Sequence, residues 1–444
     1  MTVTGERTPS TGKLWRNWGR SESVRPLFVA RPRSVEEVQQ AIAFARERGL
    51  PVKAVGAGHS FTAIAAAPGM QLDLTELSGL IRADVETRQV TIAAGTRLHE
   101  LPAILAPLGL AMENLGDIDR QSISGATSTG THGTGAAFRG LAAQIAALTL
   151  VTADGEVMTI SESENPELLP AARLGLGALG VIVDVTIQCV PAFTLHAVER
   201  PEPFTDVVDA FEARATAVDH FEFYWFPHTD RVLTKTNTRL PADAPRRPLG
   251  PVRRWVDDSL MSNGVFAATC GIGRAAPAVI PAINRLATHL TGNREFTDVS
   301  TSVFTTQRSV RFREQEYALP RAAVPQALRD IRALIASRGW KVSFPIEVRV
   351  AAPDNLWLST AYGRESGYVA VHRYWREDPT EYFGAIEKIM RNFGGRPHWG
   401  KMHTLNSTVL GDLYPHHADF VALRDRLDPD RVFANPYLAR VLGP

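Results

Sequence analysis

The sequence predicts an α+β protein of two domains, and three observations lead to this fold class. Its 444 residues are more than one hydrophobic core usually organises. The first half combines an amphipathic helix with short β-branched runs. The second half carries longer strand-like runs and two amphipathic helices, which is typical of an antiparallel sheet covered by helices.

The first element is a helix over residues 34–49. Ser34 is a favourable N-cap, and Glu37, three residues later, completes a capping box. One apolar stripe recurs at helical spacing and consists of Val35, Val38, Ala41, Ile42 and Ala45. Gly49 suits the left-handed residue that ends a helix. We expect a strand over 52–55 next, so the following turn begins at the carboxyl end of a strand.

The rest of the first half alternates short strands with one helix. We expect, in chain order, a strand at 70–75, a strand–turn–strand at 79–95, a helix at 96–110, a hairpin at 144–161 and a strand at 180–191. Asp154 and Gly155 are typical of the two-residue turn of a hairpin. Pro191 interrupts the last strand, and we place the domain boundary close to it.

The second half predicts one larger sheet. Strand-like runs lie at 221–227, 342–353 and 367–375, and amphipathic helices lie at 325–338 and 379–392. This alternation of strand-like runs with helices indicates an antiparallel sheet covered by helices, an α+β second domain.

Composition and charge exclude several classes of function. The chain carries 48 Lys and Arg against 47 Asp and Glu, and a net charge of +1 gives no footprint for nucleic acid or an acidic membrane. No apolar run approaches the roughly 18 residues of a membrane span, and residues 1–15 lack the apolar core of a secretory signal. Cys189 and Cys270 are the only cysteines. We therefore expect a cytoplasmic globular protein in a reducing compartment.

The segment VGAGHSFTAIA at 55–65 places His59 on a glycine-rich turn after a predicted strand. Glycine lets a backbone approach a ligand closely because it has no side chain. One interpretation is an ordinary loop with a hydrogen-bonded histidine, and the other is a histidine held there to react. The turn alone leaves both open.

A second glycine cluster, DRQSISGATSTGTHGTG at 119–135, offers many backbone N–H groups and little side-chain bulk. Such a segment can line a flat ring or wrap a pyrophosphate, although a plain surface loop has the same composition. It lacks the Gly-Lys-Ser/Thr of a Walker motif and the helix that follows a Rossmann fingerprint. His132 and His59 raise the question of a metal, but no HxxxH or CxxC pair occurs, so we expect no metal site.

A group of charged residues marks the second half. Alternation in VSFPIEVRVAAP puts Glu347 and Arg349 on one face of a strand. A surface ion pair on a half-exposed strand is the simplest alternative. The segment GRPHWGKMH presents Lys401 on a tight turn anchored by Trp399. A carboxylate, a guanidinium and an ammonium together could bind a polyhydroxylated ligand and stabilise an alkoxide.

Seven segments in order resemble one family, and they are RPRSVEEV, VGAGHSFTAIA, ENLGDIDRQSISGATSTGTHGTG, LGALGVI, FPIEVR, RPHWGKMH and LDPDRVFANPYLARVLG. They span nearly all of the chain. Each segment is modest alone, but the ordered set is highly specific. The sequence is similar to the sugar-1,4-lactone oxidases and dehydrogenases of the vanillyl-alcohol oxidase group of flavoproteins, the L-gulono-1,4-lactone and D-arabinono-1,4-lactone oxidase type.

This resemblance implies a two-domain flavoprotein. Residues 1–190 would form an FAD-binding domain of two α+β subdomains, on which residues 415–444 pack back. Residues 191–414 would form a substrate-binding cap with a large antiparallel sheet covered by helices. In the family the histidine of the GHS turn is bonded covalently to the flavin, and that histidine maps onto His59.

The resemblance also implies which residues contact FAD. They are Val55, Gly56, Ala57, Gly58 and Ser60 on the pyrophosphate and adenosine side, Ser122, Ser124, Gly125, Thr129, His132 and Gly133 on a second wall, Val181 or Ile182 near the adenine, and Gly116 with Asp117 beside the flavin ring. The family carries Gly or Ala at the position of Gly116. A missing methyl group there opens a path for O2, although related dehydrogenases use another electron acceptor.

The family chemistry assigns roles to the charged residues. Hydride leaves a carbinol carbon of the substrate for the flavin N5 atom while the hydroxyl loses its proton. Arg349 and Lys401 would stabilise the developing alkoxide and the negative charge of the reduced flavin. Glu347 would orient Arg349 and bind substrate hydroxyls. His372 would complete the pocket or serve only as a structural residue of its strand.

Two other functions stay open. In the leading interpretation, a gulonolactone-type member, oxidation at C2 of the lactone gives a 2-keto lactone that enolises to ascorbate. Alditol oxidases, which oxidise the primary alcohol of xylitol or sorbitol with O2, share the GHS turn and the Glu-x-Arg pair. The HWGKMH context favours lactones over alditols. A non-catalytic sugar-binding protein that keeps the fold is the third interpretation.

Overall fold

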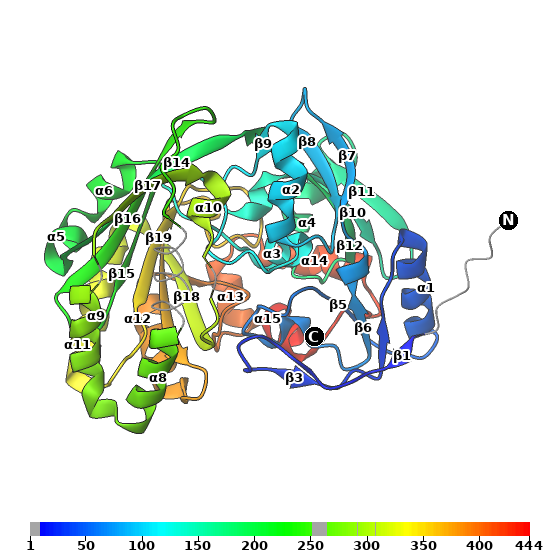
Figure 1. Ribbon diagram of the computed structural model, residues 1–444. Coiled ribbons are helices and arrows are strands. Elements are labelled where there is room, and N and C mark those ends of the chain that lie inside the picture. Colours follow the sequence, from blue (N-terminus) through cyan, green and yellow to red (C-terminus); the bar gives the residue numbers. More distant parts are fainter. Residues whose placement is uncertain (1–8, 251–263, 291, 307) are drawn as a thin grey trace.

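The computed structural model describes residues 9–250, 264–290, 292–306 and 308–444. The chain builds two lobes, one from its first part and one around a large sheet formed by its middle part (Figure 1). Helices and mixed sheets make up the first lobe, and the second holds an antiparallel sheet with helices on it. The predicted α+β class with a large antiparallel sheet in the C-terminal part is confirmed.

A small sheet carries the predicted first helix. Its order is β1-β4-β6-β5, with β1 (Ser10–Thr11), β4 (Phe28–Ala30), β6 (Met70–Asp73) and β5 (Val52–Val55). β5 and β4 run parallel to β6, and α1 (Val35–Arg46) joins β4 to β5. Ser34 caps α1 by accepting a hydrogen bond from the N–H of Glu37, and Gly49 takes a φ of 63° after the helix.

A second, fully antiparallel sheet completes the first lobe. Its order is β11-β10-β12-β8-β7, with β11 (Val157–Ser161), β10 (Ile145–Val151), β12 (Val181–Gln188), β8 (Gln89–Ala93) and β7 (Leu80–Asp84). The predicted hairpin is β10–β11, and Gly155 in its turn has a φ of 88°. The helix expected at 96–110 is broken into the 3-10 turn η3 (Leu98–Glu100), α2 (Leu101–Leu105) and the turn η4 (Ala106–Leu108). Pro102 and Pro107 lack the N–H that a continuous helix needs.

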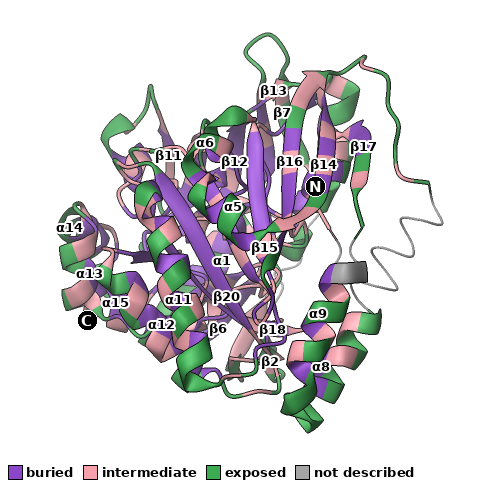
Figure 2. Ribbon diagram, turned by 90° about the vertical axis from the view of Figure 1, so that its left-hand side faces the viewer, coloured by how far each residue is buried: buried purple, intermediate pink, exposed green. Residues whose placement is uncertain are grey.

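The large sheet is antiparallel throughout, with eight strands in the described part of the chain. Its order is β17 (Arg294–Val299), β14 (Phe193–Pro203), β16 (Arg231–Pro241), β15 (His220–Trp225), β19 (Ile346–Ala351), β20 (Ser366–Tyr374), β18 (Phe312–Pro320) and β21 (Arg396–Pro397). Figure 2 shows β20 buried along most of its length. The strand expected at 342–353 begins only at Ile346, because Pro345 cannot donate to a ladder.

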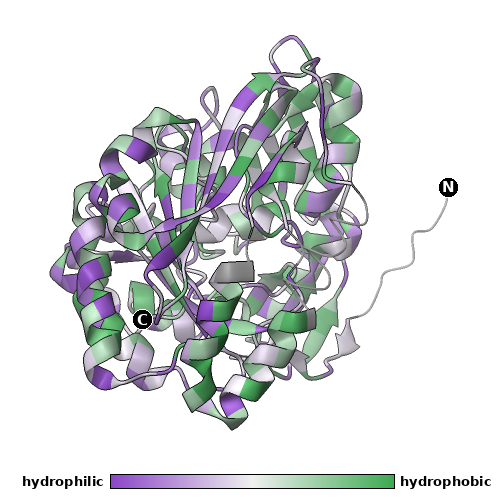
Figure 3. Cartoon of the chain, turned by 60° about the vertical axis from the view of Figure 1, so that its left-hand side comes forward, coloured by the Kyte–Doolittle hydropathy of each residue, from purple (hydrophilic) through white to green (hydrophobic). Residues whose placement is uncertain are grey.

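Two amphipathic helices cover this sheet, as predicted. α11 (Val324–Arg338) and α12 (Thr380–Asn392) contact each other, β20 and β18. α11 buries one stripe that consists of Val324, Ala327, Leu328, Ile331 and Ile335. Figure 3 shows that helices of the molecule carry both hydrophilic and hydrophobic residues. No helix among the described residues has the length and apolarity that crossing a bilayer requires.

The last part of the chain returns to the first lobe. It contains α13 (Ser407–Leu413), α14 (His417–Leu427) and α15 (Pro436–Leu442). The N–H of Val52 in β5 donates to the carbonyl of Val432 at 2.7 Å. The side-chain amide of Asn435 donates to three carbonyls of the segment after the glycine turn, those of Ala63, Ile64 and Ala66. The division into residues 1–190, 191–414 and a returning 415–444 stays a prediction, and these bonds are what a returning segment requires.

Asn435 should therefore matter more for stability than an ordinary helix cap. Asn435→Ala removes the cap of α15 and leaves three carbonyls without their donor. We expect it to lower the free energy of unfolding by about 3 kcal/mol. Asn406→Ala removes only the cap of α13 from an exposed residue and should cost about 1 kcal/mol. Urea denaturation of both variants measures the difference, and equal losses would contradict the role of the side-chain amide.

Candidate functional site

The glycine turn and the second glycine cluster are in direct contact. Gly58 has a φ of 67°, a conformation that favours glycine. A Cβ atom on Gly56 would lie 2.2 Å from Oγ of Ser122, which caps the short helix α3 (Ile123–Thr129). Only glycine at position 56 lets the two segments meet without a shift. Gly56 and Ser122 are 66 residues apart in the sequence. The two glycine-rich segments that contain them therefore form one wall.

This wall holds backbone donors that the protein itself does not use. Within the described residues, no hydrogen bond to a protein acceptor is made by the backbone N–H groups of Ala57, Gly58, His59 and Ser60 in the turn, or of Gly116, His132 and Gly133 in the second segment. The last three residues are buried. Buried N–H groups are costly unless they are paired, so these donors suit a ligand rich in oxygen acceptors. The pyrophosphate and the ring carbonyls of FAD fit that description.

His59 stands at the edge of this wall. Its ring stacks on the indole of Trp18, with the ring centroids 5.6 Å apart and the planes at 26°. Burial lowers the pKa of His59 to about 4, and the positive charges of Arg97, Lys401 and Arg120 act in the same direction. The imidazole is therefore neutral at neutral pH, which leaves a nitrogen lone pair for reaction.

The turn that carries Lys401 lies directly beside the glycine turn. The N–H of Phe61 donates to the carbonyl of Gly400 at 2.7 Å, and Oγ1 of Thr62 donates to the carbonyl of Trp399 at 3.2 Å. Trp399 is fully buried, as its predicted anchoring role requires. The ammonium of Lys401 bonds the carboxylate of Glu314. The predicted site residues His59 and Lys401 thus lie close together.

Glu347 and Arg349 share one face of β19, as the alternation predicts. Nη2 of Arg349 bonds Oε1 of Glu347, and its Nε lies 3.1 Å from Oε2 of Glu222. The side chains of Arg349 and Glu347 are only 11% and 14% exposed, so the alternative of a surface ion pair is wrong. Burial opposes the charge of Arg349, but the neighbouring carboxylates hold its pKa well above the ordinary value.

The register of the large sheet extends this pair into a row of polar side chains. Lys235 lies opposite Glu222, Tyr224 opposite Glu347, and Glu314 opposite His372. Because alternate residues of a strand point to one face, the polar row comprises Lys235, Glu222, Tyr224, Glu347, Arg349, His372, Glu314 and Glu316. Buried charges need partners, and the row supplies them across four strand pairs.

Gly116 and Asp117 connect the glycine wall to the polar row. A Cβ atom on Gly116 would lie 3.1 Å from the carbonyl oxygen of His132, so the position has little room for a side chain. Oδ2 of Asp117 lies 2.9 Å from Nε of Arg308. Burial opposes the charge of Asp117, yet Arg308 and then Arg349 lower its pKa. Asp117 thus has a charged partner in Arg308, 191 residues along the chain, which the sequence did not reveal.

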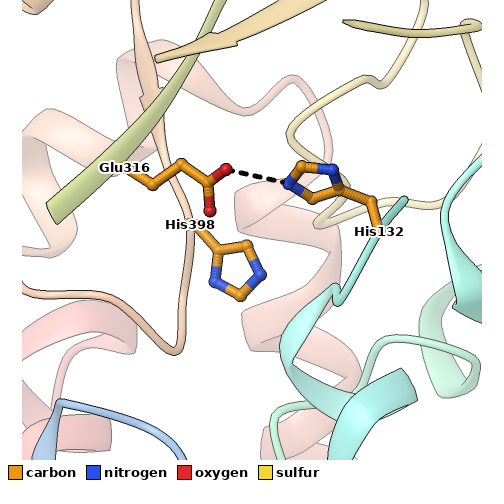
Figure 4. Close-up of side chains that lie close together, drawn as sticks. All are labelled: His132, Glu316 and His398. Atoms are coloured by element: carbon orange, nitrogen blue, oxygen red, sulfur yellow. Dashed lines mark ion pairs between the residues drawn. The ribbon is translucent and has the colours of Figure 1, made fainter. Parts of the chain in front are cut away.

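His132 joins the two lobes from the glycine side. Its Nε2 lies 3.2 Å from Oε1 of Glu316, and its ring stacks on Tyr368 with the centroids 3.6 Å apart. Figure 4 shows His132, Glu316 and His398 converging. All three are buried, and one possible ligand atom of each lies within 4.8 Å of the others. The cluster therefore has to be weighed as a metal site.

The hydrogen bonds of the two histidines favour a proton network over a metal. Nδ1 of His398 accepts the N–H of Gly400 at 3.0 Å, so its Nε2 carries the hydrogen and no nitrogen lone pair is free. Nδ1 of His132 lies 2.9 Å from the carbonyl oxygen of Gly133 and donates to it. Burial lowers the pKa of His398 to about 4. Burial opposes the charge of Glu316, but His132 and Lys401 hold its pKa well below the ordinary value. We assign no metal to this cluster.

The remaining predicted cofactor residues lie in the framework of the wall. Oγ of Ser124 donates to the carbonyl of Ala94 at 2.8 Å, and Oγ1 of Thr129 donates to the carbonyl of Gly125 at 3.0 Å. Two more, Val181 and Ile182, are the first residues of β12 and belong to the hydrophobic core. Their contacts with FAD stay predictions, as does the contact of Val55 at the end of β5.

Five of the eight residues of the polar row were not predicted from the sequence. The missed residues are Glu222, Tyr224, Lys235, Glu314 and Glu316, together with Arg308 and Trp18. FEFYWF carried a usable signal, because a glutamate amid aromatic residues of a buried strand needs a partner. The two glutamates of REQEYALP alternate in the same way. Lys235, Arg308 and Trp18 had no comparable signal in the sequence.

Two family models match the chain. The D-arabinono-1,4-lactone oxidase model matches residues 185–441, and the FAD binding domain model matches residues 26–161. The second match contains both glycine segments, so FAD is the group that these unpaired donors suit.

Curated relatives match along the whole chain. L-gulono-1,4-lactone dehydrogenase of Mycobacterium tuberculosis is 44% identical over 97% of this chain and 99% of that protein. L-gulonolactone oxidase of Bos taurus is 34% identical over 97% of this chain and 98% of that protein. Among solved structures, cholesterol oxidase from B. sterolicum has a TM-score of 0.83 and covers 100% of this chain and 99% of its own, at 18% identity. That likeness concerns the fold alone.

Proposed function

The chain belongs to the D-arabinono-1,4-lactone oxidase family of FAD-dependent lactone oxidoreductases, and we propose that it oxidises a carbinol of a sugar-1,4-lactone. One observation carries this proposal. The charged face of the large sheet, with Glu347 and Arg349, and the adjoining turn of Lys401 meet the wall of unpaired backbone donors around His59. A bound FAD on that wall supplies an acceptor for hydride.

Two cations, Arg349 of the polar row and Lys401 beside it, suit the oxygen of the carbinol. Burial opposes the charge of Lys401, but Glu314 and Glu316 raise its pKa above the ordinary value. Arg349 is held charged by Glu347 and Glu222. Both groups therefore stay positive at neutral pH and stabilise negative charge that develops on the oxygen. Glu347 has Oε1 engaged by Arg349 and Tyr224, and its second oxygen can accept a substrate hydroxyl.

The preferred substrate in this proposal is L-gulono-1,4-lactone. The two relatives named for that lactone match nearly the full length of the chain. Oxidation at C2 would give a 2-keto lactone that enolises to ascorbate. The electron acceptor is O2 or another oxidant, because one of these relatives is named a dehydrogenase and the other an oxidase. The absent side chain at Gly116 favours access of O2.

A substrate panel tests the proposed function. We expect L-gulono-1,4-lactone and D-arabinono-1,4-lactone to exceed xylitol and sorbitol in kcat/KM by about tenfold or more, about 1.4 kcal/mol of transition-state binding. Each compound is assayed under air, with detection of peroxide, and with an artificial dye as acceptor. Preference for an alditol would replace the lactone proposal by an alditol oxidase. Protein that stays colourless after FAD is offered would favour a non-catalytic sugar-binding protein.

We also propose a covalent bond between His59 and the flavin. The neutral imidazole and the unpaired donors of its turn support it. After acid precipitation we expect a yellow pellet from the natural enzyme and a yellow supernatant from His59→Ala. His99→Ala is a matched control, because His99 is exposed and lies outside the turn. A white pellet from the natural enzyme would rule the bond out.

Arg349 and Lys401 should act on the reaction and not on retention of the cofactor. We expect Arg349→Ala and Lys401→Ala to slow reduction of the flavin by substrate about 100-fold or more, because each removes a cation from the developing alkoxide. The absorbance of bound flavin should persist in both variants. Lys388→Ala on the exposed side of α12 is the matched control. A normal rate of flavin reduction in anaerobic stopped flow would remove that residue from the mechanism.

A further inference from the structure

His372 on β20 has one ring nitrogen fixed by the backbone. Its Nδ1 lies 3.0 Å from the carbonyl oxygen of Pro345. A carbonyl only accepts, so Nδ1 carries a hydrogen and donates it. Pro345 lies just outside β19, which begins at Ile346, and this position leaves its carbonyl available to the histidine. The other nitrogen, Nε2, is therefore the one that can gain and lose a proton.

Nε2 of His372 faces the carboxylate of Glu314. Its distance to Oε1 is 3.6 Å, which is too long for a hydrogen bond but close enough to stabilise a positive ring. Burial opposes the charge of Glu314, yet Lys401 and His372 lower its pKa to about 2. Glu314 is thus ionised at neutral pH, with Oε2 bound to Lys401. The carboxylate of Glu314 stabilises a protonated ring, and in the neutral ring the lone pair of Nε2 faces this negative charge.

The surroundings hold the ring and limit the access of water. His372 is 7% exposed, and the rings of Phe312 and Phe344 lie 5.0 Å and 6.1 Å from it. Phe312 also contacts Trp18, whose indole stacks on His59. An unbroken aromatic cluster therefore links His372 to the residue proposed to hold the flavin.

The charged groups around His372 divide into acceptors and cations. Glu314 from β18 and Glu347 from β19 act directly on it, and Glu316 from β18 and Lys401 from the turn after β21 lie beside Glu314. Lys401 is protonated and cannot take a proton. Glu347 is the other carboxylate of the polar row beside His372 that the family chemistry places at the substrate, and its Oε1 already accepts from Arg349 and Tyr224.

We propose that His372, assisted by Glu314, is the general base that takes the proton of the substrate hydroxyl. The proposal rests on the proposed lactone oxidation. The C–H bond of the carbinol breaks and its hydride, with both electrons, goes to FAD. The O–H bond breaks, its proton goes to Nε2 of His372, and the C=O bond forms. The carboxylate of Glu314 then faces an imidazolium and stabilises it. Glu314 acts through His372 and Lys401 and is a positioning residue.

The pH dependence of flavin reduction tests this proposal. In the natural enzyme the anaerobic rate should rise with pH to a plateau, as a base must be unprotonated. His372→Gln should lower the plateau about 100-fold and abolish the rise. Glu314→Gln should lower the plateau less and move the half-maximal pH downward, because the imidazolium loses its neighbouring carboxylate. Glu365→Gln, an exposed partner of Arg321, is the matched control and should leave the profile unchanged.

A readout without turnover protects the test against misfolding of a variant. In nitrogen-15 histidine spectra of the natural holoenzyme, we expect the ring of His372 to carry its hydrogen on Nδ1 at high pH and on both nitrogens at low pH. The signal is assigned by its loss in His372→Gln. A ring that carries its single hydrogen on Nε2 would overturn the proposal, since such a nitrogen cannot accept a proton.

The outcomes distinguish a wrong role for His372 from a wrong proposed function. An unchanged pH profile in His372→Gln, with loss of the profile in Glu347→Gln, would make Glu347 the base and refute the role of His372. A natural enzyme whose flavin no lactone reduces would contradict the proposed function itself. In that case the tautomer of His372 still tests whether Nε2 can accept a proton.

Discussion

The rest of this structure depends on the burial of charge on one face of the large sheet. Arg349, Glu222 and Lys235 are each about one-tenth exposed or less, and such charges are stable only when they are paired. Removing one partner of a buried pair costs about 3–5 kcal/mol, because it leaves the other charge uncompensated. The register of β16, β15, β19, β20 and β18 supplies the partners by placing opposite charges on neighbouring strands. The sheet therefore fixes these groups before any substrate arrives.

The first lobe contributes uncharged backbone donors, in contrast to the charged side chains of the large sheet. Its glycine segments present backbone N–H groups and almost no side-chain charge, which suits an anionic cofactor with a flat ring. Among the contacts that bring the two lobes together are those of Phe61 with Gly400, Thr62 with Trp399, and His132 with Glu316. Each of these contacts involves a predicted motif. The motifs therefore hold the two lobes against each other and also supply reactive groups.

The sequence predicted the local features well and the long-range partners poorly. The helix capped by Ser34, the turn at Gly155 and the shared face of Glu347 and Arg349 follow from spacing alone, and the structure contains each of them. The partner of Lys401 is Glu314, 87 residues away, and no local pattern encodes that pairing. The broken helix at 96–110 shows the same limit, since two prolines outweighed the apolar periodicity.

A division of labour among the cations follows from how each is held. Arg349 has two carboxylates, from Glu347 and Glu222, and a guanidinium that binds them with fixed geometry. Lys401 has Glu314 as its ion-pair partner among the described residues, and its flexible ammonium can turn from that carboxylate toward a new negative charge. If Lys401 turns to an alkoxide, Glu314 loses its cation at the moment when a second positive charge forms on His372. The carboxylate would then exchange one cation for another, so the net charge of the buried face changes little during the reaction.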